Sequence, residues 1–308
     1  MRRSVVLIGN FDGVHLGHQS LIDRARAHAT ALTDDEGPLP VLAVTFWPHP
    51  TKIFNPEHTP KLLCPLPERL DLLTSNGVDE VRVVQFTEEI SGWSPQQFIE
   101  TILMPLNPAA IVVGENFRFG KKAAGTPQDL REYSAGLSDG FDVDEVALAE
   151  IEHRVASSSA IREALQAGDV ETAAVNLGRY FRARGVVVVG DQRGRLLGFP
   201  TANLPISSEY EVPADGVYAG WVRVLDDPDV KMPAAISVGS NPTFDGVLNR
   251  RVESYVLDRD DLELYGKWIA VDFVAQLRGM IKFSSVDELV KQMNKDVEKT
   301  RELLAPSA

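Results

Sequence analysis

Residues 9–18 decide how this chain is organised, and they read Gly-Asn-Phe-Asp-Gly-Val-His-Leu-Gly-His. The apolar run at residues 5–8 comes directly before them, and a helical pattern of apolar residues follows. A glycine-rich turn therefore joins a buried strand to the start of a helix, where unpaired backbone N–H groups favour an anion. This arrangement predicts a phosphate-binding site.

Two histidines in this stretch suggest what the site does. His15 and His18 are three residues apart, so both imidazoles can face one phosphate chain and stabilise charge that builds up as a phosphoanhydride bond breaks. A coincidental surface pair is the alternative, but the strand, the Asp-Gly turn and the helix around the pair favour the functional interpretation. We predict that the following residues bind ATP: Gly9, Asn10, Phe11, Asp12, Gly13, His15, Gly17 and His18.

The composition limits the classes of partner. The chain has 308 residues, enough for two domains, and a net charge of −13, which argues against nucleic acid or an anionic membrane as a partner. No stretch of the sequence approaches the length of an apolar membrane span. Cys64 is the only cysteine, which excludes an intrachain disulfide and predicts a cytoplasmic protein.

The first half of the sequence predicts an α/β domain. Continuous apolar runs separated by helical patterns are typical of a parallel sheet covered by helices on both faces, in a Rossmann-like arrangement. Ligands bind such sheets at the carboxyl ends of the strands. The further strands are expected at residues 41–46, 81–86 and 109–113, and helices near residues 68–75 and 95–104.

Polar residues follow these strands. Residues 45–50, Thr-Phe-Trp-Pro-His-Pro, are by themselves better explained as a proline-stiffened loop than as part of a site. Residues 114–120 contain an asparagine, an arginine and two aromatic residues between glycines, and we expect Asn116 to meet the nucleotide. Residues 120–126 nearly match a Walker A loop, but Thr126 stands where the lysine should be; no G-x-G-x-x-G occurs either.

The second half predicts a different fold. A helix at residues 169–181 is expected to join two domains that divide near Gly178, into residues 1–178 and 179–308. Short strands punctuated by Gly and Pro then indicate a small antiparallel β-barrel. A final helix from Ser285, with Glu288 completing a capping box, is expected to pack on that barrel. The strands are expected at residues 185–190, 218–225, 234–238, 252–257 and 268–273.

Chemistry in the second half must use oxygen and guanidinium groups, because all six histidines and the cysteine lie at or before His153. Such groups favour Mg²⁺ over zinc. Residues 190–203 form a glycine-bracketed basic loop followed by Pro-Thr-Ala-Asn, although on composition alone a decorated hairpin would be the better explanation. Thr201 and Asn203 can offer oxygens to a metal-bound phosphate. The residues expected to line such a site are Gly190, Arg195, Gly198, Phe199, Pro200, Thr201 and Asn203.

These motifs together resemble a known family. Residues 9–18 resemble the H-x-G-H signature of nucleotidyltransferases, in the form G-x-F-D-G-x-H-x-G-H of their flavin branch. Residues 157–162 resemble a second signature, S-S-T-x-[IV]-R, with Ser159 in place of threonine, and residues 194–203 match the flavokinase signature G-R-x-L-G-F-P-T-A-N. Further segments follow in the same order. The chain resembles the bacterial bifunctional riboflavin kinases and FAD synthetases.

The resemblance implies two activities that use small-molecule substrates. Riboflavin and ATP would give FMN in the barrel, and FMN and ATP would give FAD and pyrophosphate in the N-terminal domain, both with Mg²⁺. It implies that Ser158, Ser159 and Arg162 hold the triphosphate together with the histidines. It also implies that Glu253, otherwise an ordinary surface glutamate on a strand, is the general base of the kinase.

Two other functions are compatible with parts of the sequence. The first is another H-x-G-H nucleotidyltransferase, of the cytidylyl- or pantetheine-adenylyltransferase type, with an accessory barrel. The second is a flavin-binding regulatory or storage protein without turnover. Glu253 and the intact Pro-Thr-Ala-Asn segment oppose both alternatives.

Overall fold

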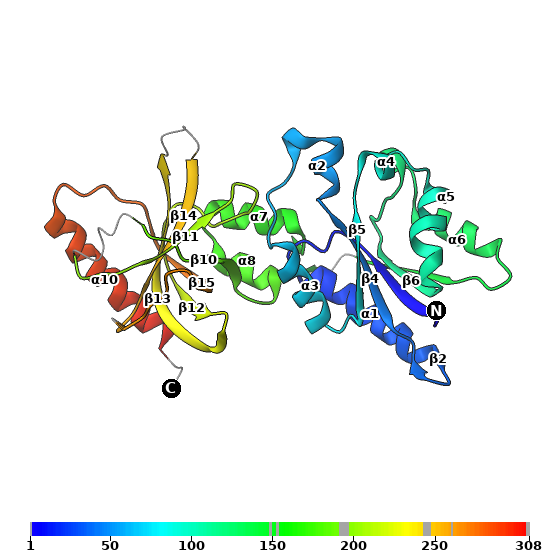
Figure 1. Cartoon of the computed structure of the whole chain (residues 1–308), viewed down its shortest axis with the longest axis horizontal. Coiled ribbons are helices and arrows are strands. Elements are labelled where there is room, and N and C mark those ends of the chain that lie inside the picture. Colours follow the sequence, from blue (N-terminus) through cyan, green and yellow to red (C-terminus); the bar gives the residue numbers. More distant parts are fainter. Residues whose placement is uncertain are drawn as a thin grey trace. The chain divides into compact units, whose positions relative to one another are not determined.

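The structure, a computed structural model, describes residues 2–147, 150–151, 154–190, 197–242, 248–259 and 261–305. The chain divides into two compact units (Figure 1). The first unit contains residues 1–60 and 65–157, and the second contains residues 61–64 and 158–308. A short segment from the middle of the first half of the sequence therefore belongs to the second unit.

The first unit is built on a five-stranded parallel sheet in the order β5-β4-β1-β6-β7, which confirms the predicted α/β fold. The strand before the glycine-rich turn, β1 (Ser4–Ile8), lies in the centre and is fully buried. The strand order reverses beside β1, which is where open α/β sheets bind ligands. The other strands are β4 (Val41–Trp47), β5 (Glu80–Gln85), β6 (Pro108–Gly114) and β7 (Asp142–Val146).

Helices cover both faces of this sheet. Successive residues of β1 point to opposite faces, so each face presents apolar side chains to a layer of helices. Val5 and Leu7 pack under α1 (Leu16–Ala31) and α3 (Leu66–Ser75). Val6 and Ile8 pack on the other face, under α5 (Pro95–Phe98), the π-helical η2 (Ile99–Leu103) and α6 (Pro127–Ala135). Figure 1 shows α1 and α3 on one side of the sheet and α5 and α6 on the other.

Short elements complete the first unit. They are β2 (Thr33–Asp34), β3 (Gly37–Pro38), α2 (Pro50–Phe54), η1 (Pro56–His58), α4 (Glu88–Ser91), η3 (Met104–Leu106), η4 (Lys121–Ala123), β8 (Glu150–Ile151) and β9 (Arg154–Val155). Thr126, at the false Walker A match, lies directly before α6. Its backbone N–H and its hydroxyl both donate to the Asp129 carboxylate at 2.7 Å, as at the start of a capped helix.

The second unit contains a six-stranded antiparallel sheet in the order β10-β15-β12-β13-β14-β11. The backbone N–H of Val188 donates to the carbonyl of Asn203 at 2.9 Å, which brings the two ends of the sheet together into a nearly closed barrel, as predicted. The strands are β10 (Phe181–Val186), β11 (Ala202–Ile206), β12 (Gly216–Val224), β13 (Asp227–Pro242), β14 (Leu248–Val256) and β15 (Trp268–Gly279).

Two helices share the core of the barrel. Ile161 of α7 (Ser158–Ala167) and Val170 of α8 (Val170–Leu177) belong to the same buried cluster as Tyr218 of β12. The helix expected at residues 169–181 ends at Leu177, because Gly178 adopts a left-handed backbone with φ 69°. Phe181 already belongs to β10. The expected helix was therefore too long at its C-terminal end.

The last helix, α10 (Val286–Leu304), begins after Ser285, whose side chain accepts from the backbone N–H of Glu288 at 3.2 Å. The Glu288 carboxylate accepts from the backbone and hydroxyl of Ser284, one residue before the expected partner. The helix packs on the barrel through its later turns, where Asp296 pairs with Arg278 of β15 at 2.8 Å. Val286, in the first turn of this helix, is 59% exposed.

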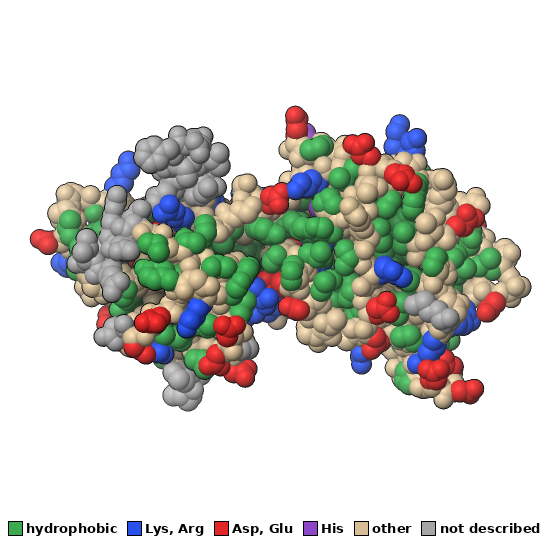
Figure 2. Space-filling view, viewed as in Figure 1, with side chains coloured by type: hydrophobic (Ala, Val, Ile, Leu, Met, Phe, Trp, Pro, Cys, Tyr) green, Lys and Arg blue, Asp and Glu red, His purple; other side chains and the backbone are tan. Residues whose placement is uncertain are grey.

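Acidic and basic side chains are interspersed on the face of the molecule shown in Figure 2. A nucleic-acid-binding surface would instead gather Lys and Arg side chains into a stripe or patch. Over the described parts of the chain, none of the helices combines the length and apolar character needed to cross a membrane.

Candidate active sites

The turn between β1 and α1 has an unusual backbone. Phe11 has φ 49°, Gly13 has φ 79° and Val14 has φ 39°. Left-handed backbone is free for glycine but unfavourable for other residues, most of all for a β-branched one such as Val14. The conformation is held by packing, since Phe11 and Val14 are fully buried. A side chain at Gly9 would meet the Phe11 ring at 3.2 Å, which explains the glycine there.

The two histidines of the motif lie together. Their rings are stacked, with centroids 3.7 Å apart and planes at 23°, and the Phe11 ring meets His18 edge-on at 5.2 Å. His15 directly precedes α1 and is 7% exposed. A Cβ at Gly17 would lie 3.1 Å from the His15 ring, so the glycine makes room for the imidazole. The structure thus places both rings at the predicted anion site.

The environment keeps the His18 ring neutral. Burial, and after it the neighbouring His15 ring and the Arg69 guanidinium, lower the pKa of His18 well below its ordinary value. Its Nδ1 is buried and has no hydrogen-bond partner within the described part of the chain. A neutral imidazole has one N–H to donate and one nitrogen that accepts. The ring is therefore suited to donate a hydrogen bond to an anionic ligand.

A buried arginine contacts the turn from the interior of the protein. The Arg69 side chain, on α3, is 0% exposed, and its Nη2 lies 3.7 Å from the Asp12 carboxylate, which is 1% exposed. Its Nη1 donates to the carbonyl of Phe46 at 3.3 Å, and its guanidinium lies 5.8 Å from the centre of the Trp47 ring. Asp12 was predicted to bind ATP. The contact with Arg69 shows that its carboxylate also has a partner within the protein.

The segment after β4 also contacts the turn. The Thr45 hydroxyl donates to the carbonyl of Asn10 at 3.0 Å, and the Asn10 amide lies 3.3 Å from Nε2 of His49. His49 also accepts from the backbone N–H of Thr51 at the start of α2. The proline-stiffened loop is thus joined to the phosphate-binding turn by polar contacts.

Asn116 lies in the loop after β6 and is exposed. Because β6 is the parallel neighbour of β1, this loop leaves the same edge of the sheet as the histidine turn. A tight turn follows the strand, since the backbone N–H of Phe117 donates to the carbonyl of Gly114 at 2.9 Å. Asn116 therefore follows the strand end expected from the sequence, and its contact with a nucleotide stays a prediction.

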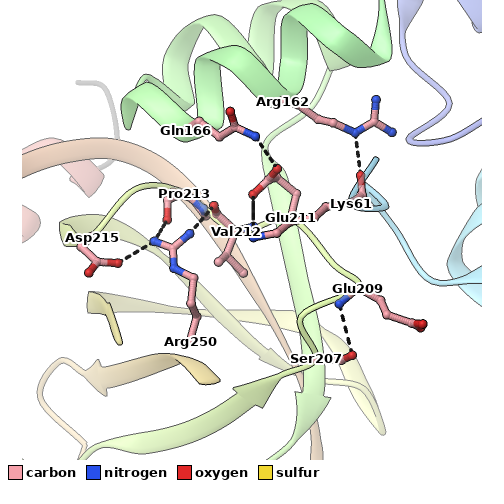
Figure 3. A network of polar contacts seen from close by, with 10 residues as sticks. All are labelled: Lys61, Arg162, Gln166, Ser207, Glu209, Glu211, Val212, Pro213, Asp215 and Arg250. Atoms are coloured by element: carbon pink, nitrogen blue, oxygen red, sulfur yellow. Dashed lines mark hydrogen bonds and ion pairs between the residues drawn. The ribbon is translucent and has the colours of Figure 1, made fainter. Parts of the chain in front are cut away.

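Ser158, Ser159 and Arg162 lie in the first turns of α7, which belongs to the second unit. Figure 3 shows Arg162 donating through Nε to the carbonyl of Lys61 at 2.6 Å. The next residue, Leu62, exchanges backbone hydrogen bonds with residues 209 and 211. Arg162 is thus fastened to the segment that joins the barrel unit, and its action on the triphosphate stays a prediction.

The same segment is held by a buried carboxylate. Glu211 has a side chain only 1% exposed, and it accepts from the Gln166 amide of α7 at 2.9 Å and from the backbone N–H of Val212 at 3.3 Å. The Lys61 ammonium lies 4.0 Å from Oε1, the carboxylate oxygen that accepts from Val212. These contacts tie α7, residues 61–64 and the barrel into one polar network (Figure 3).

In the barrel, Asn203 is buried on β11 and lies against Gly190. A Cβ at Gly190 would lie 2.6 Å from the Asn203 amide group, so only glycine permits this approach. Its amide donates to the carbonyl of Thr201 at 3.3 Å, and the nearby Phe199 ring packs edge-on against Tyr255. Gly198 has φ 86°, Pro200 is exposed, and Arg195 lies outside the described residues.

Glu253 lies opposite Asn203 in the barrel wall. The register of β14 pairs it with Asn203 on one side and with Ser237 of β13 on the other. Its neighbours Val252 and Ser254 are fully buried and point into the barrel, so Glu253 points outward and is half-buried. The structure thus joins two predicted site residues that are fifty positions apart in the chain.

Comparison with known proteins identifies the family. The sequence profile of the FAD synthetase family matches residues 1–160, and that of the riboflavin kinase family matches residues 177–304. Curated proteins described as bifunctional riboflavin kinase/FMN adenylyltransferase are similar along almost the whole chain. The Listeria monocytogenes protein is 35% identical over 98% of this chain and 92% of its own length, and the Escherichia coli K12 protein is 36% identical over 97% and 92%. The chain belongs to the bifunctional riboflavin kinase/FMN adenylyltransferase family.

A solved structure agrees with this family fold. A Streptococcus pneumoniae protein described as a macrolide-efflux protein is 35% identical and superposes with a TM-score of 0.86, over 97% of this chain and 94% of its own. Its description names a transport function, whereas the two profiles that match this chain name enzymes.

The kinase half of this family member has donors that fit a hard metal ion. Thr201 and Asn203 carry oxygens of the kind that Mg²⁺ binds, and the packing of Asn203 against Gly190 holds the amide in place. The described residues contain no group of three or more His, Cys, Asp or Glu that could bind a metal ion by themselves.

Sequence reasoning missed Arg69, Thr45 and the contact of His49. One signal was available for Arg69, because it precedes the core residue Leu73 by four positions and so lies on the buried face of α3. The Asn10 contact of His49 depends on how β4 lies beside β1, which no local pattern shows.

Proposed function

We propose that this chain phosphorylates riboflavin with ATP to give FMN and then transfers an adenylyl group from ATP to FMN, giving FAD and pyrophosphate. The observation that carries the proposal is that both family profiles match, one over each half of the chain. The riboflavin kinase reaction belongs to the barrel and the adenylyl transfer to the parallel-sheet unit. Its small-molecule partners are riboflavin, FMN and ATP, and we propose that it acts in the cytoplasm.

In the kinase reaction, Glu253 takes the proton from the 5′-hydroxyl of the ribityl chain as the oxygen attacks the γ-phosphorus of ATP, and the bond from that phosphorus to the leaving ADP breaks. An alcohol is a poor nucleophile at neutral pH, so a base must be held beside it. Cross-strand pairing holds Glu253 next to Asn203, and we assign Thr201 and Asn203 to the phosphate chain and to the Mg²⁺ that would bind there. When bound, the ion would neutralise phosphate charge. Gly190, Arg195, Gly198, Phe199 and Pro200 form the remaining nucleotide and flavin contacts.

In the adenylyl transfer, a phosphate oxygen of FMN attacks the α-phosphorus of ATP, and the bond to pyrophosphate breaks. His15 and His18 donate hydrogen bonds to the charge that develops on the phosphate oxygens. The backbone of the turn, from Gly9 to Gly13 and at Gly17, presents N–H groups to the same anion. Asn116, Ser158, Ser159 and Arg162 complete the triphosphate contacts, and catalysis is by positioning and charge stabilisation.

One experiment tests both reactions. The purified chain is incubated with riboflavin, ATP and MgCl₂, and the flavins are separated by chromatography over time. FMN should appear first and FAD afterwards, and neither should form when EDTA replaces the metal. Riboflavin that stays unchanged would contradict the proposal and favour a flavin-binding protein, whereas turnover of another nucleotide substrate would favour a different nucleotidyltransferase.

The division of the two activities near Gly178 stays a prediction. A fragment that begins at Arg179 should make FMN and no FAD. A second fragment, from Ser158, keeps Ile161 and Val170, which belong to the buried cluster of the barrel. The fragment from Ser158 should therefore unfold at a higher temperature. A folded but kinase-inactive fragment from Arg179 would show that the kinase needs more of the chain than residues 179–308.

A further inference from the structure

Arg69 is placed where a charge is costly. Its side chain is fully buried, and removing a guanidinium from water costs several kcal/mol unless partners replace the lost hydration. The carboxylate of Asp12 lies 3.7 Å away, which is an ion-pair distance but longer than a hydrogen bond, and the Phe46 carbonyl accepts at 3.3 Å. A buried ion pair does not by itself show that the fold is stabilised. The place of the Arg69–Asp12 pair in the structure is therefore more informative than its interaction energy.

That position is the centre of the strained turn. Asp12 lies between Phe11, with φ 49°, and Gly13, with φ 79°, and Val14 follows with φ 39°. Non-glycine residues are unfavourable in this region and persist only where the surroundings hold them. Arg69 contacts both Asp12 in the turn and the end of β4, so it ties the turn to the neighbouring strand.

We propose that Arg69 is a positioning residue of the adenylyl-transfer site, which holds the turn of residues 9–18 in its productive form through Asp12. This inference rests on the proposed function and adds to it a residue outside the motif. Arg69 acts through Asp12 and His18 and does not itself touch the nucleotide. The arrangement gives the turn a rigid support on its protein side while its other side receives the phosphate chain.

The charge of Arg69 has a second effect, on His18. The charged groups that act on this ring are the His15 imidazole beside it and the Arg69 guanidinium on α3, which itself lies 3.7 Å from the Asp12 carboxylate. Burial together with these neighbours lowers the pKa of His18, so the ring stays neutral on both sides of neutral pH. Arg69→Gln removes one of the two positive charges that lower the pKa of His18, so this pKa should rise.

The test uses the full-length chain with Arg69→Lys and Arg69→Gln. FAD formation from supplied FMN and ATP is measured as kcat and KM between pH 5 and 9. In both variants kcat should fall at least about tenfold, because a 1 Å misplacement can cost about 10²-fold. In Arg69→Gln the acidic limb of the pH profile should also move to higher pH, whereas Arg69→Lys, which keeps the charge, should leave the limb in place.

Two controls isolate the effect. FMN formation in the same preparations should stay within about twofold of wild type, because the barrel is a separate unit. Arg131→Gln removes another arginine of the first unit, one that pairs with Glu145 on the surface and is 41% exposed. It should change neither kcat nor the pH profile of FAD formation.

The outcomes separate the inference from the function. A wild-type chain that makes FAD, with both Arg69 variants within threefold in kcat and unshifted in pH profile, would overturn the inference alone. A wild-type chain that makes no FAD would overturn the proposed function. If Arg69→Gln does not fold, NMR of the wild-type chain with labelled histidine decides. A His18 that titrates at or above the ordinary range would contradict the role of Arg69.

Discussion

The two candidate sites are built in opposite ways. The adenylyl-transfer site lies at the carboxyl end of β1, on a turn with left-handed residues, stacked histidines and a buried ion pair beneath them. The kinase site lies along the wall of the barrel, where regular cross-strand pairing sets Glu253 beside Asn203. The first site has its reactive groups within one short motif, whereas the second joins residues fifty positions apart.

This difference shows where each site depends on the rest of its unit. A turn can be distorted by losing a support that is far away in sequence, such as Arg69. A pair of strand residues keeps its spacing as long as the ladder of backbone hydrogen bonds is intact. Changes outside the motif should therefore reach the first site through backbone geometry and electrostatics, whereas the second site should respond mainly to changes at the paired residues and their direct neighbours.

The largest expected effect is on the histidine pair. His15→Ala combined with His18→Ala should abolish FAD formation, since losing one such donor typically costs ~10²–10³-fold in rate. FMN should still accumulate from riboflavin, because the imidazoles belong to the other unit. Chromatography of the flavins formed from riboflavin and ATP measures both steps. FAD synthesis near the wild-type rate would show that the motif is only a structural turn.

Glu253→Gln tests the second site. The amide keeps the shape and hydrogen bonding of the carboxylate but cannot take a proton, so the rate of FMN formation should fall by ~10²–10⁴-fold. Conversion of supplied FMN into FAD should not change and serves as the internal control. A kinase rate within about threefold of wild type, with chemistry shown to be rate-limiting, would remove Glu253 from the mechanism.

Gly190→Ala tests whether the position of the Asn203 side chain matters, because it displaces Asn203 without replacing it. The new Cβ would lie 2.6 Å from the Asn203 amide and must push it aside. The kcat/KM of the kinase should fall by ~10–10²-fold, as expected for a misplaced phosphate contact. Gly279→Ala is the matched control, since a Cβ there meets nothing within 4 Å. Equal kinase rates in the two variants would contradict the role given to Asn203.

The smallest effect is expected at Thr126, the false Walker A position. Asp129→Ala removes the carboxylate that accepts from Thr126 and should lower stability by ~1 kcal/mol without changing either activity. These hydrogen bonds lower the pKa of Asp129, so their stabilisation is present at neutral pH and is lost as the pH falls through that depressed pKa. Thermal unfolding of wild type and variant should therefore converge in acid. A loss of FAD formation would show that this loop does contact the nucleotide.

Much of the fold could be predicted because the signal is local. The apolar runs that became β1, β4 and β6 are buried on both faces, and the pattern of a parallel sheet is visible in them. β7 was missed because it is an edge strand whose acidic residues hide its apolar ones. β11 was missed because Pro200 and the glycines before it resemble a loop.

The sites were predictable only in part. Motif residues such as His15 and Asn203 could be named, because each lies in a stretch with its own local chemistry. The pairing of Asn203 with Glu253 depends on strand register, and the contact of Arg69 with Asp12 depends on where α3 packs. Long-range contacts of this kind follow from the assembled fold, which a single sequence does not display.

Residues 61–64 have a consequence for biosynthesis. The first unit can fold once residue 157 has left the ribosome, but Leu62, which belongs to the second unit, must wait for its hydrogen-bond partners at residues 209 and 211. At ~5–20 residues per second, the roughly fifty residues between these points take ~3–10 s to synthesise. During that interval the backbone of Leu62 lacks its final pairing, although the residues on both sides of the segment belong to a unit that can already fold. This short segment therefore gives a chaperone or a neighbouring nascent chain an opportunity to bind.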